Sequence, residues 1–262
     1  MHPAMPGTTS FTTRGPVAVF TINRPEAGNA MTWAMYDALA DACDRVDAAS
    51  DLRVLVIRAT GDVFCAGTDI SQFATFSTRE DGAEYERRLE TCVARLERVA
   101  ISTIAQVEGI AAGAGCAIAL ACDLRVCSPK ARFGVPIART LGNALSFENC
   151  ARLVDHFGLA RAKTLLITAG WVDAAEAAAA GVARLAEPAE VERVVDELAA
   201  AIARNAPLTI RAAKQALSRL AVRNSYDADE IAGLVAECYA SADFREGVSA
   251  FLGKRPPKFT GR

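Results

Sequence analysis

The stretch VEGIAAGAGCAIALACD, residues 107–123, decides the fold, together with FCAGTDI at residues 64–70. An apolar, β-branched run over residues 103–107 stops near Gly109, and small residues then lead into a run of helical character. This order predicts a strand, a tight turn and the buried start of a helix. The upstream stretch follows another apolar run and predicts a second turn of the same kind.

Small side chains at both turns let a ligand approach the backbone closely. The first N–H groups of a helix have no partner within it and can bind negative charge. A turn at Ala66 and Gly67 leaves the N–H of Thr68 free to point into a site, and two such groups form an oxyanion hole. Two other interpretations are close packing alone and a dinucleotide fingerprint, although the latter needs a glycine where Ile118 stands.

Composition narrows the class of protein. A chain of 262 residues with 52% hydrophobic side chains supports one large domain, or a core with a smaller appendage. The net charge of −2 gives no basic field for nucleic acid. No apolar run reaches membrane-spanning length and residues 1–10 do not resemble a signal peptide, so we expect a cytoplasmic protein without a membrane partner.

The eight cysteines form no CxxC pair and most lie in apolar runs. Reduced thiols in the core are therefore expected, and neither disulfides nor a zinc site. No arrangement of residues matches a Ser/His/Asp triad or another metal site. His156, in an apolar helical stretch, is expected to be structural.

Strand and helix patterns alternate along the first half of the chain. Strands are predicted over residues 17–22, 53–58, 103–107 and 124–127, and Thr32 can cap a helix after the first of them. This order predicts an α/β fold, in which helices cross over a sheet.

Longer helical patterns follow. Residues 77–99 predict a helix with one apolar face, and its charges, such as Glu84, Glu86 and Arg87, are expected on a solvated face. The alternative, that one of these charges reaches a site, stays open. From Leu153 onwards the pattern is helical to the end of the chain, interrupted by glycines and prolines.

Four motifs along the chain carry a resemblance to a known family. They are FCAGTDI, VEGIAAGAGCAIALACDLRV, ARFGVP and EGVSAFLGKRPPKF, which begin at residues 64, 107, 131 and 246. In order and spacing they resemble the enoyl-CoA hydratase/isomerase (crotonase) family. The resemblance implies an α/β fold, a spiral of repeated ββα units, with a C-terminal helical oligomerisation region.

Domain boundaries follow from this resemblance. Residues 1–200 are expected to form the spiral core with an acyl-CoA site, and residues 201–262 a helical trimerisation region. Capping-box patterns at residues 227–230 and 243–246 begin two of its helices. An apolar stripe there could pack on its own core, but the resemblance favours a homotrimer or a dimer of trimers. The stripe consists of Ile231, Leu234, Val235 and Cys238.

The family resemblance also implies the chemistry. An acyl-CoA thioester would be the substrate, with coenzyme A as part of it and no permanently bound cofactor. Negative charge on the thioester oxygen would be stabilised by the backbone N–H groups of Thr68 and Ala114, the latter replacing the family's usual glycine. Substrate-binding positions carried over from the family or placed near its pocket are Arg24, Ala27, Ala66, Gly67, Asp69, Ile70, Gly113, Ala117, Ile137, Arg139, Asn143, Phe251, Lys254 and Lys258.

Two of these positions depart from the family pattern. Ala117 and Ile137 stand where family hydratases carry glutamates, and neither can carry a proton. Because a general acid or base contributes about 10²–10⁴ in rate, orthodox hydration should be weak. Glu148 is the nearest carboxyl in sequence and a candidate for the missing base, although an acidic residue in a first helical turn also simply suits the helix dipole. Asp69 is expected to be mainly structural.

Three functions remain open. The first is an enoyl-CoA hydratase/isomerase family enzyme with an altered site. The second is another family reaction, such as isomerisation, hydrolysis or decarboxylation, with an unorthodox proton donor. The third is an acyl-CoA-binding protein without catalysis. Arg139 and Asn143 near the pocket would suit a polar or carboxylated acyl group.

Overall fold

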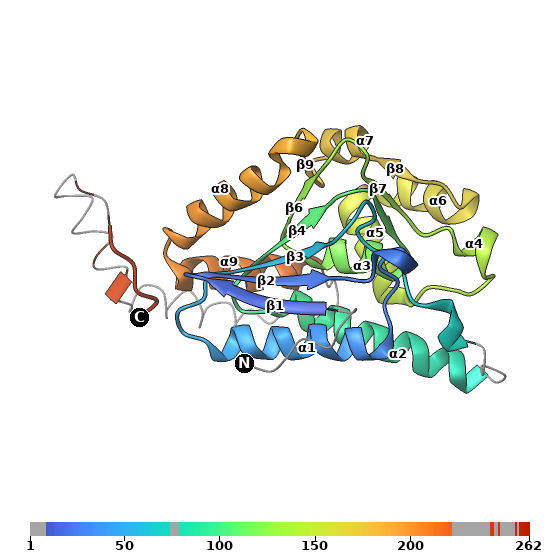
Figure 1. Cartoon of the computed structure of the whole chain (residues 1–262), viewed down its shortest axis with the longest axis horizontal. Coiled ribbons are helices and arrows are strands. Elements are labelled where there is room, and N and C mark those ends of the chain that lie inside the picture. Colours follow the sequence, from blue (N-terminus) through green and yellow to red (C-terminus); the bar gives the residue numbers. More distant parts are fainter. Residues whose placement is uncertain (1–8, 74–78, 222–241, 244–245, 247–254, 256) are drawn as a thin grey trace.

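A six-stranded sheet forms the centre of the molecule (Figure 1). The computed structural model describes residues 9–73, 79–221, 242–243, 246, 255 and 257–262. The strand order is β1-β2-β3-β4-β6-β9; β1 pairs antiparallel with β2, and the other neighbours are parallel. The strands are β1 (Thr9–Arg14), β2 (Val17–Ile22), β3 (Val54–Ala59), β4 (Ser102–Val107), β6 (Leu124–Cys127) and β9 (Arg184–Leu185).

A second, three-stranded sheet has the order β5-β7-β8. Its strands are β5 (Ile110–Ala112), β7 (Arg132–Gly134) and β8 (Val172–Asp173), of which β5 and β7 are parallel. β5 follows β4 of the large sheet after a two-residue break and is itself followed by a helix that begins at Ala114.

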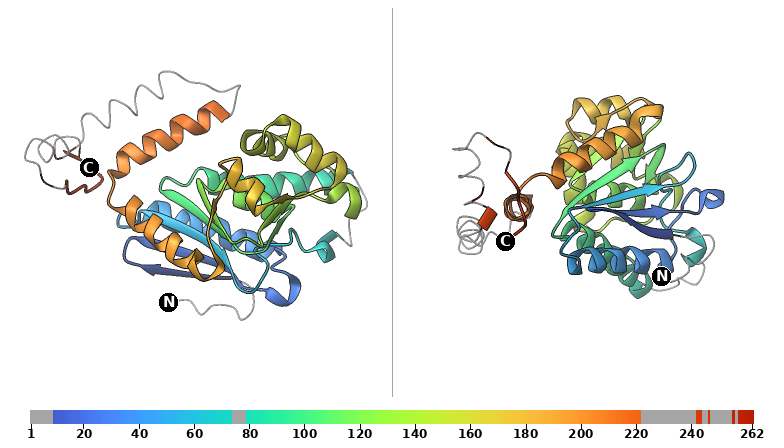
Figure 2. Two further views of the ribbon diagram at one scale, coloured as in Figure 1. Left: turned by 90° about the horizontal axis from the view of Figure 1, so that it is seen from above. Right: turned by 60° about the vertical axis from the view of Figure 1, so that its left-hand side comes forward.

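Helices cover both faces of the large sheet (Figures 1 and 2). Alternate residues of β3 divide between two cores, as the period of a strand requires. Val54 and Val56 pack with α8, whereas Leu55 and Ile57 belong to the larger core that includes α1 and α2. The helices are α1 (Trp33–Ala48), α2 (Arg79–Glu97), α3 (Ala114–Ala121), α4 (Ile137–Thr140), α5 (Phe147–Phe157), α6 (Leu159–Thr168), α7 (Ala174–Ala179), α8 (Val191–Ala203) and α9 (Pro207–Ala221), with 3-10 turns η1 (Pro25–Ala27), η2 (Ile70–Phe73) and η3 (Pro188–Glu190).

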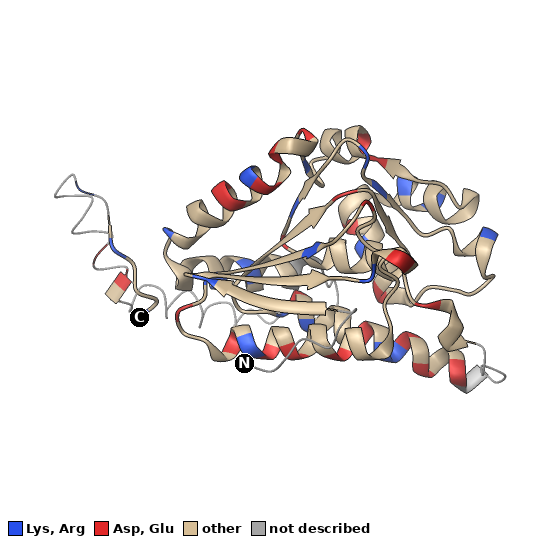
Figure 3. Ribbon diagram, in the orientation of Figure 1, with Lys and Arg blue, Asp and Glu red and all other residues tan. Residues whose placement is uncertain are grey.

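Local sequence explains the start of α1. The side chain of Thr32 accepts a hydrogen bond from the N–H of Met35, which satisfies one of the free donors at the helix start. Arg95 of α2 bridges Asp44 and Asp47 of α1, each at 2.7 Å, so the two helices are also held at their outer edge. Figure 3 shows most charged residues on the helices, with the strands of the large sheet largely free of them.

The predicted α/β alternation is confirmed, with element ends that differ by one or two residues. One prediction is wrong: the chain after Leu153 is not helical throughout, because β8 and β9 lie within it and extend both sheets. Two of the C-terminal predictions lie outside the described residues: the capping box at residues 227–230 and the apolar stripe. The same holds for most of the helix predicted to begin at the capping box of residues 243–246. Among the helices that the structure describes, none is long and apolar enough to cross a membrane.

Candidate functional site

The two motif stretches meet backbone to backbone. The N–H of Cys65 donates to the carbonyl of Ile110, and the N–H of Ala112 donates to the carbonyl of Cys65, both at 2.9 Å. A Cβ on Gly115 would lie 2.3 Å from that same carbonyl oxygen, so only glycine fits there. We call residues 65–68 together with residues 112–115 the turn junction.

The turn junction brings together the two backbone segments that carry the N–H groups singled out from the sequence. Gly67 has a φ of +109°, and a Cβ built on it would lie 3.8 Å from the nitrogen of Ala114. Within the described part of the chain, neither the N–H of Thr68 nor that of Ala114 donates a hydrogen bond. Gly113, between them, donates to the carbonyl of Gly134 at 2.9 Å, which fixes the start of α3. The arrangement can therefore offer two nearby donors to an acceptor.

A pocket opens beside α3. It brings together five positions predicted from the sequence: Gly113, Ala114, Ala117, Ile137 and Asn143. Its lining residues come mainly from α2, α3, α5 and the segment after β7: Tyr85, Glu86, Leu89, Gly113, Ala114, Cys116, Ala117, Leu120, Val135, Ile137, Asn143, Leu145, Asn149, Arg152 and Leu153. Most of this surface is apolar, as small-molecule sites usually are.

Glu86 is the carboxylate among these lining residues. Its Oε2 atom accepts the N–H of Ser146 at 3.1 Å, and burial raises the pKa of the carboxyl group. The sequence pattern predicts a solvated face for this residue and leaves open the alternative that one of the charges of α2 reaches a site, and Glu86 lines the pocket. A signal was present, because Glu86 stands three residues before Leu89 and so continues the apolar stripe of α2.

Arg152 of α5 also lines the pocket and is held by two carboxylates of α2. Its guanidinium donates to Glu90 at 2.5 and 2.7 Å and to Glu97 at 2.5 and 2.9 Å. It also donates to Oδ1 of Asn149 at 2.8 Å. We call these four residues together with Glu86 the polar wall; the sequence left a site role open only for Glu86.

Thr68 links the turn junction to the pocket. Its hydroxyl lies 2.7 Å from the hydroxyl of Tyr36 and 2.9 Å from that of Tyr85. Burial raises the pKa of Tyr85 to about 12, so this pocket hydroxyl stays protonated at neutral pH. The side chain of Thr68 is thus fixed on both sides, which holds the backbone that carries its N–H.

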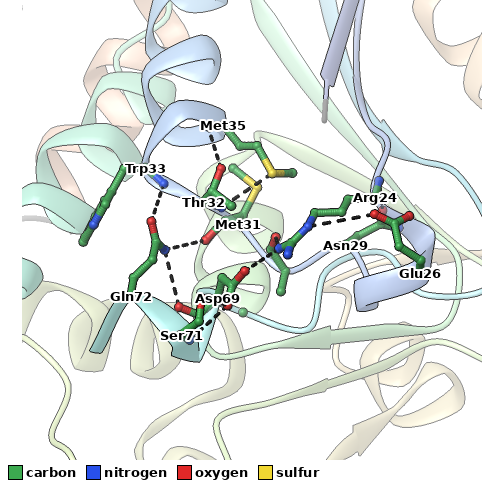
Figure 4. A network of polar contacts seen from close by, with 12 residues as sticks. Arg24, Glu26, Asn29, Met31, Thr32, Trp33, Met35, Asp69, Ser71 and Gln72 are labelled. Atoms are coloured by element: carbon green, nitrogen blue, oxygen red, sulfur yellow. Dashed lines mark hydrogen bonds and ion pairs between the residues drawn. The ribbon is translucent and has the colours of Figure 1, made fainter. Parts of the chain in front are cut away.

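Arg24 and Asp69 form an ion pair beside the turn junction (Figure 4). Nη1 of Arg24 lies 2.6 Å from Oδ2 of Asp69 and also donates to the carbonyl of Ala30. Hydrogen bonds from Ser71, and then from Arg24, lower the pKa of the Asp69 carboxyl. The Oδ1 atom of Asn29 accepts the N–H of Arg24, which holds together the loop between these two residues. These bonds agree with the structural role expected for Asp69.

Other predicted residues lie at the surface. Ala66 is exposed within the turn junction, Ile70 is exposed in η2, and Ala27 is half-buried in η1. Arg139 and Glu148 are also exposed, and neither is among the residues that line the pocket. Lys258 is exposed near the chain end, and Phe251 and Lys254 lie outside the described residues.

The buried thiols and the imidazole are suited to structural roles. Burial raises the pKa values of Cys65 and of the pocket residue Cys116 to about 12, which leaves both as unreactive thiols. His156 lies 3.0 Å from the carbonyl oxygen of Leu120, and burial lowers its pKa to about 4. Among the described residues, no group of three His, Cys, Asp or Glu side chains is placed to hold a metal ion.

An α/β fold with two strand-to-helix turns meeting above a pocket defines a protein with a small-molecule site. The family model described as enoyl-CoA hydratase/isomerase matches residues 12–262. The chain is 33% identical over 248 residues to the short-chain-enoyl-CoA hydratase of Clostridium acetobutylicum, covering 92% of this chain and 93% of that protein. It is 34% identical over 253 residues to the 2,3-dehydroadipyl-CoA hydratase of Escherichia coli, with coverage of 94% and 96%. The chain belongs to the enoyl-CoA hydratase/isomerase family.

Solved structures agree with this assignment. An enoyl-CoA hydratase/carnithine racemase from Magnetospirillum magneticum superposes with a TM-score of 0.89 at 29% identity, covering 99% of this chain and 97% of that one. An enoyl-CoA hydratase/isomerase family protein from Hyphomonas neptunium gives 0.89 at 31% identity, with coverage of 97% and 98%. The fold is therefore the crotonase fold that the motifs predicted.

Proposed function

We propose that this protein binds an acyl-CoA thioester and stabilises negative charge on the thioester oxygen with the N–H groups of Thr68 and Ala114. The observation that carries the proposal is the turn junction, where two unpaired donors lie beside a mostly apolar pocket. Such a preorganised donor is worth about 3–4 kcal/mol of transition-state stabilisation when the charge develops against it. Coenzyme A enters as part of the substrate, and Arg24 and Lys258 are cations available to its phosphates.

The reaction does not use glutamates at the two family positions. Ala117 and Ile137 line the pocket but carry no proton, so we assign proton transfer to Glu86 in the same pocket. Burial raises the pKa of the Glu86 carboxyl, and carboxyl groups with perturbed pKa values are common among residues that transfer protons. Glu148, the candidate nearest in sequence, is exposed. An altered hydratase, or another reaction that passes through a thioester enolate, fits this arrangement better than orthodox hydration.

Deuterium exchange at the α carbon tests this proposal without requiring the natural substrate. We expect the protein to bind butyryl-CoA in calorimetry and to incorporate deuterium from D₂O, measured by mass spectrometry. Glu86→Gln should lower the exchange rate by about 10²–10⁴ while binding persists. Loss of exchange in Glu148→Gln instead would move the proton-transfer role to Glu148. Binding without exchange in the unmodified protein would leave a non-catalytic acyl-CoA-binding protein, and no binding would overturn the proposal.

Single-turnover absorbance of the enoyl-thioester band separates the reactions. With crotonyl-CoA and a longer enoyl-CoA, we expect slow loss of the band, because the two glutamate positions hold alanine and isoleucine. Fast loss would establish hydration despite these substitutions. We also propose, from the family, that the protein assembles as a homotrimer or a dimer of trimers. Residues 201–262 would form the contacts between subunits, and residues 1–200 the core. A monomeric mass in light scattering would contradict this proposal.

A further inference from the structure

Asn149 carries a polar atom that the fold leaves unsatisfied. The residue is 4% exposed and lines the pocket from α5. Within the described part of the chain its Nδ2 atom has no hydrogen-bond partner. A buried donor without an acceptor costs about 1–3 kcal/mol, so a group that accepts from it has an energetic advantage over one that does not.

The orientation of the amide is fixed by Arg152. The Oδ1 atom of Asn149 accepts from Nη1 of Arg152, and turning the amide over would set two donors against each other. The other four N–H groups of Arg152 donate to Glu90 and Glu97, which uses all five donors of the guanidinium. Arg152 therefore has no N–H left for a ligand, whereas the two N–H groups of Asn149 have no acceptor within the described part of the chain.

The charge of the polar wall decides which kind of acceptor fits. One guanidinium stands against the two carboxylates of Glu90 and Glu97, so these three side chains carry one net negative charge even when Glu86 is protonated. A carboxylate on the acyl chain would meet this excess of negative charge and would find no free cation on Arg152. An uncharged oxygen avoids that repulsion and can still accept a hydrogen bond.

We propose that Asn149 is a specificity-determining residue that binds an uncharged oxygen, a ketone or hydroxyl, on the acyl chain of the thioester. This inference rests on the proposed acyl-CoA function and narrows its substrate class. Of the polar or carboxylated acyl group expected from Arg139 and Asn143, it keeps the polar alternative, because Asn143 lines the pocket whereas Arg139 is exposed and is not among the lining residues.

Binding constants for a series of CoA thioesters test the inference. The ligands are hexanoyl-CoA and its 3-oxo, 4-oxo and 5-oxo forms, with succinyl-CoA as the anionic member. At least one oxo form should bind the unmodified protein about tenfold more tightly than hexanoyl-CoA, since satisfying a buried donor is worth roughly that factor. A ketone only accepts hydrogen bonds, so the ratio of its Kd to that of hexanoyl-CoA reports the Nδ2 donor.

Variants identify the donor. Asn149→Asp keeps an oxygen toward Arg152 and removes the NH₂ group, so the tenfold preference should disappear; Asn149→Leu should give the same loss if the aspartate variant fails to fold. Asn205→Asp makes the same change on an exposed residue outside the pocket lining and should keep the preference. Equal binding of all the thioesters with uncharged acyl chains, or tighter binding of succinyl-CoA, would overturn the inference and leave the proposed function intact. Binding of none would overturn both.

Discussion

The turn junction and the polar wall face the same pocket but are built from different parts of the chain. The turn junction is made of backbone groups within two short motifs, and its geometry depends on glycines whose missing side chains let the two segments touch. The polar wall is made of side chains from α2 and α5, which are more than fifty residues apart in sequence and meet only in the folded protein.

The turn junction is the kind of feature that a whole family can share, whereas the polar wall is the kind that can differ from one chain to another. A backbone donor persists through any substitution that keeps the turn, so Ala114 can replace glycine without loss of its N–H. Side chains can be exchanged singly, so the polar wall can change the substrate while the fold stays the same. Mutations should therefore affect the two regions in different ways.

The largest effect is expected where a buried charge loses its partner. Arg152→Met would leave Glu90 and Glu97 without their cation, at a cost of about 3–5 kcal/mol in the free energy of unfolding. Chemical denaturation of the variant and of the unmodified protein measures this change in the free energy of unfolding. Arg193→Met is the control, because its partners Glu190 and Glu197 are on the surface, and its effect should stay below about 1 kcal/mol. Equal effects would mean that the polar wall contributes no more than a surface ion pair.

A smaller loss should follow from filling the turn junction. In Gly115→Ala the new Cβ would overlap the carbonyl oxygen of Cys65, and because that atom belongs to the backbone we expect destabilisation of about 3 kcal/mol. Gly82→Ala is the matched control, since a Cβ there meets nothing within 4 Å and alanine favours the α2 helix by about 1 kcal/mol. Thermal unfolding of both variants tests this; a neutral Gly115→Ala would show that the two segments can move apart.

Much of the fold could be predicted from sequence because it depends on local patterns. The strand at residues 124–127 and the cap at Thr32 follow from neighbouring residues, and both are confirmed. The two-residue strands β8 and β9 could not be predicted, because each forms only by pairing with a distant strand. A segment that short has no periodicity of its own.

The candidate site divides in the same way. The motifs predicted that Ala114, Ala117 and Ile137 lie together, and all three line the pocket. Proximity in sequence suggested Glu148, but the carboxyl that reaches the pocket is Glu86, on a helix that precedes α3 in the chain. Which helix face turns inward there depends on tertiary packing, and a single charged residue on an apolar stripe is a weak signal.

The smallest predicted effect concerns pH and the α5 side of the pocket. Burial, and then the charge of Arg125, lowers the pKa of His156 from 6.5 to about 4, while its hydrogen bond to the Leu120 carbonyl opposes the shift. The unfolded chain binds a proton below pH 6.5 that the folded protein does not bind until about pH 4, so stability is lost as pH falls through this window. Between pH 7 and pH 5 the loss should be about 2 kcal/mol. His156→Gln can keep the donor to Leu120 and should remove this dependence; an unchanged pH profile would assign it to the carboxylates.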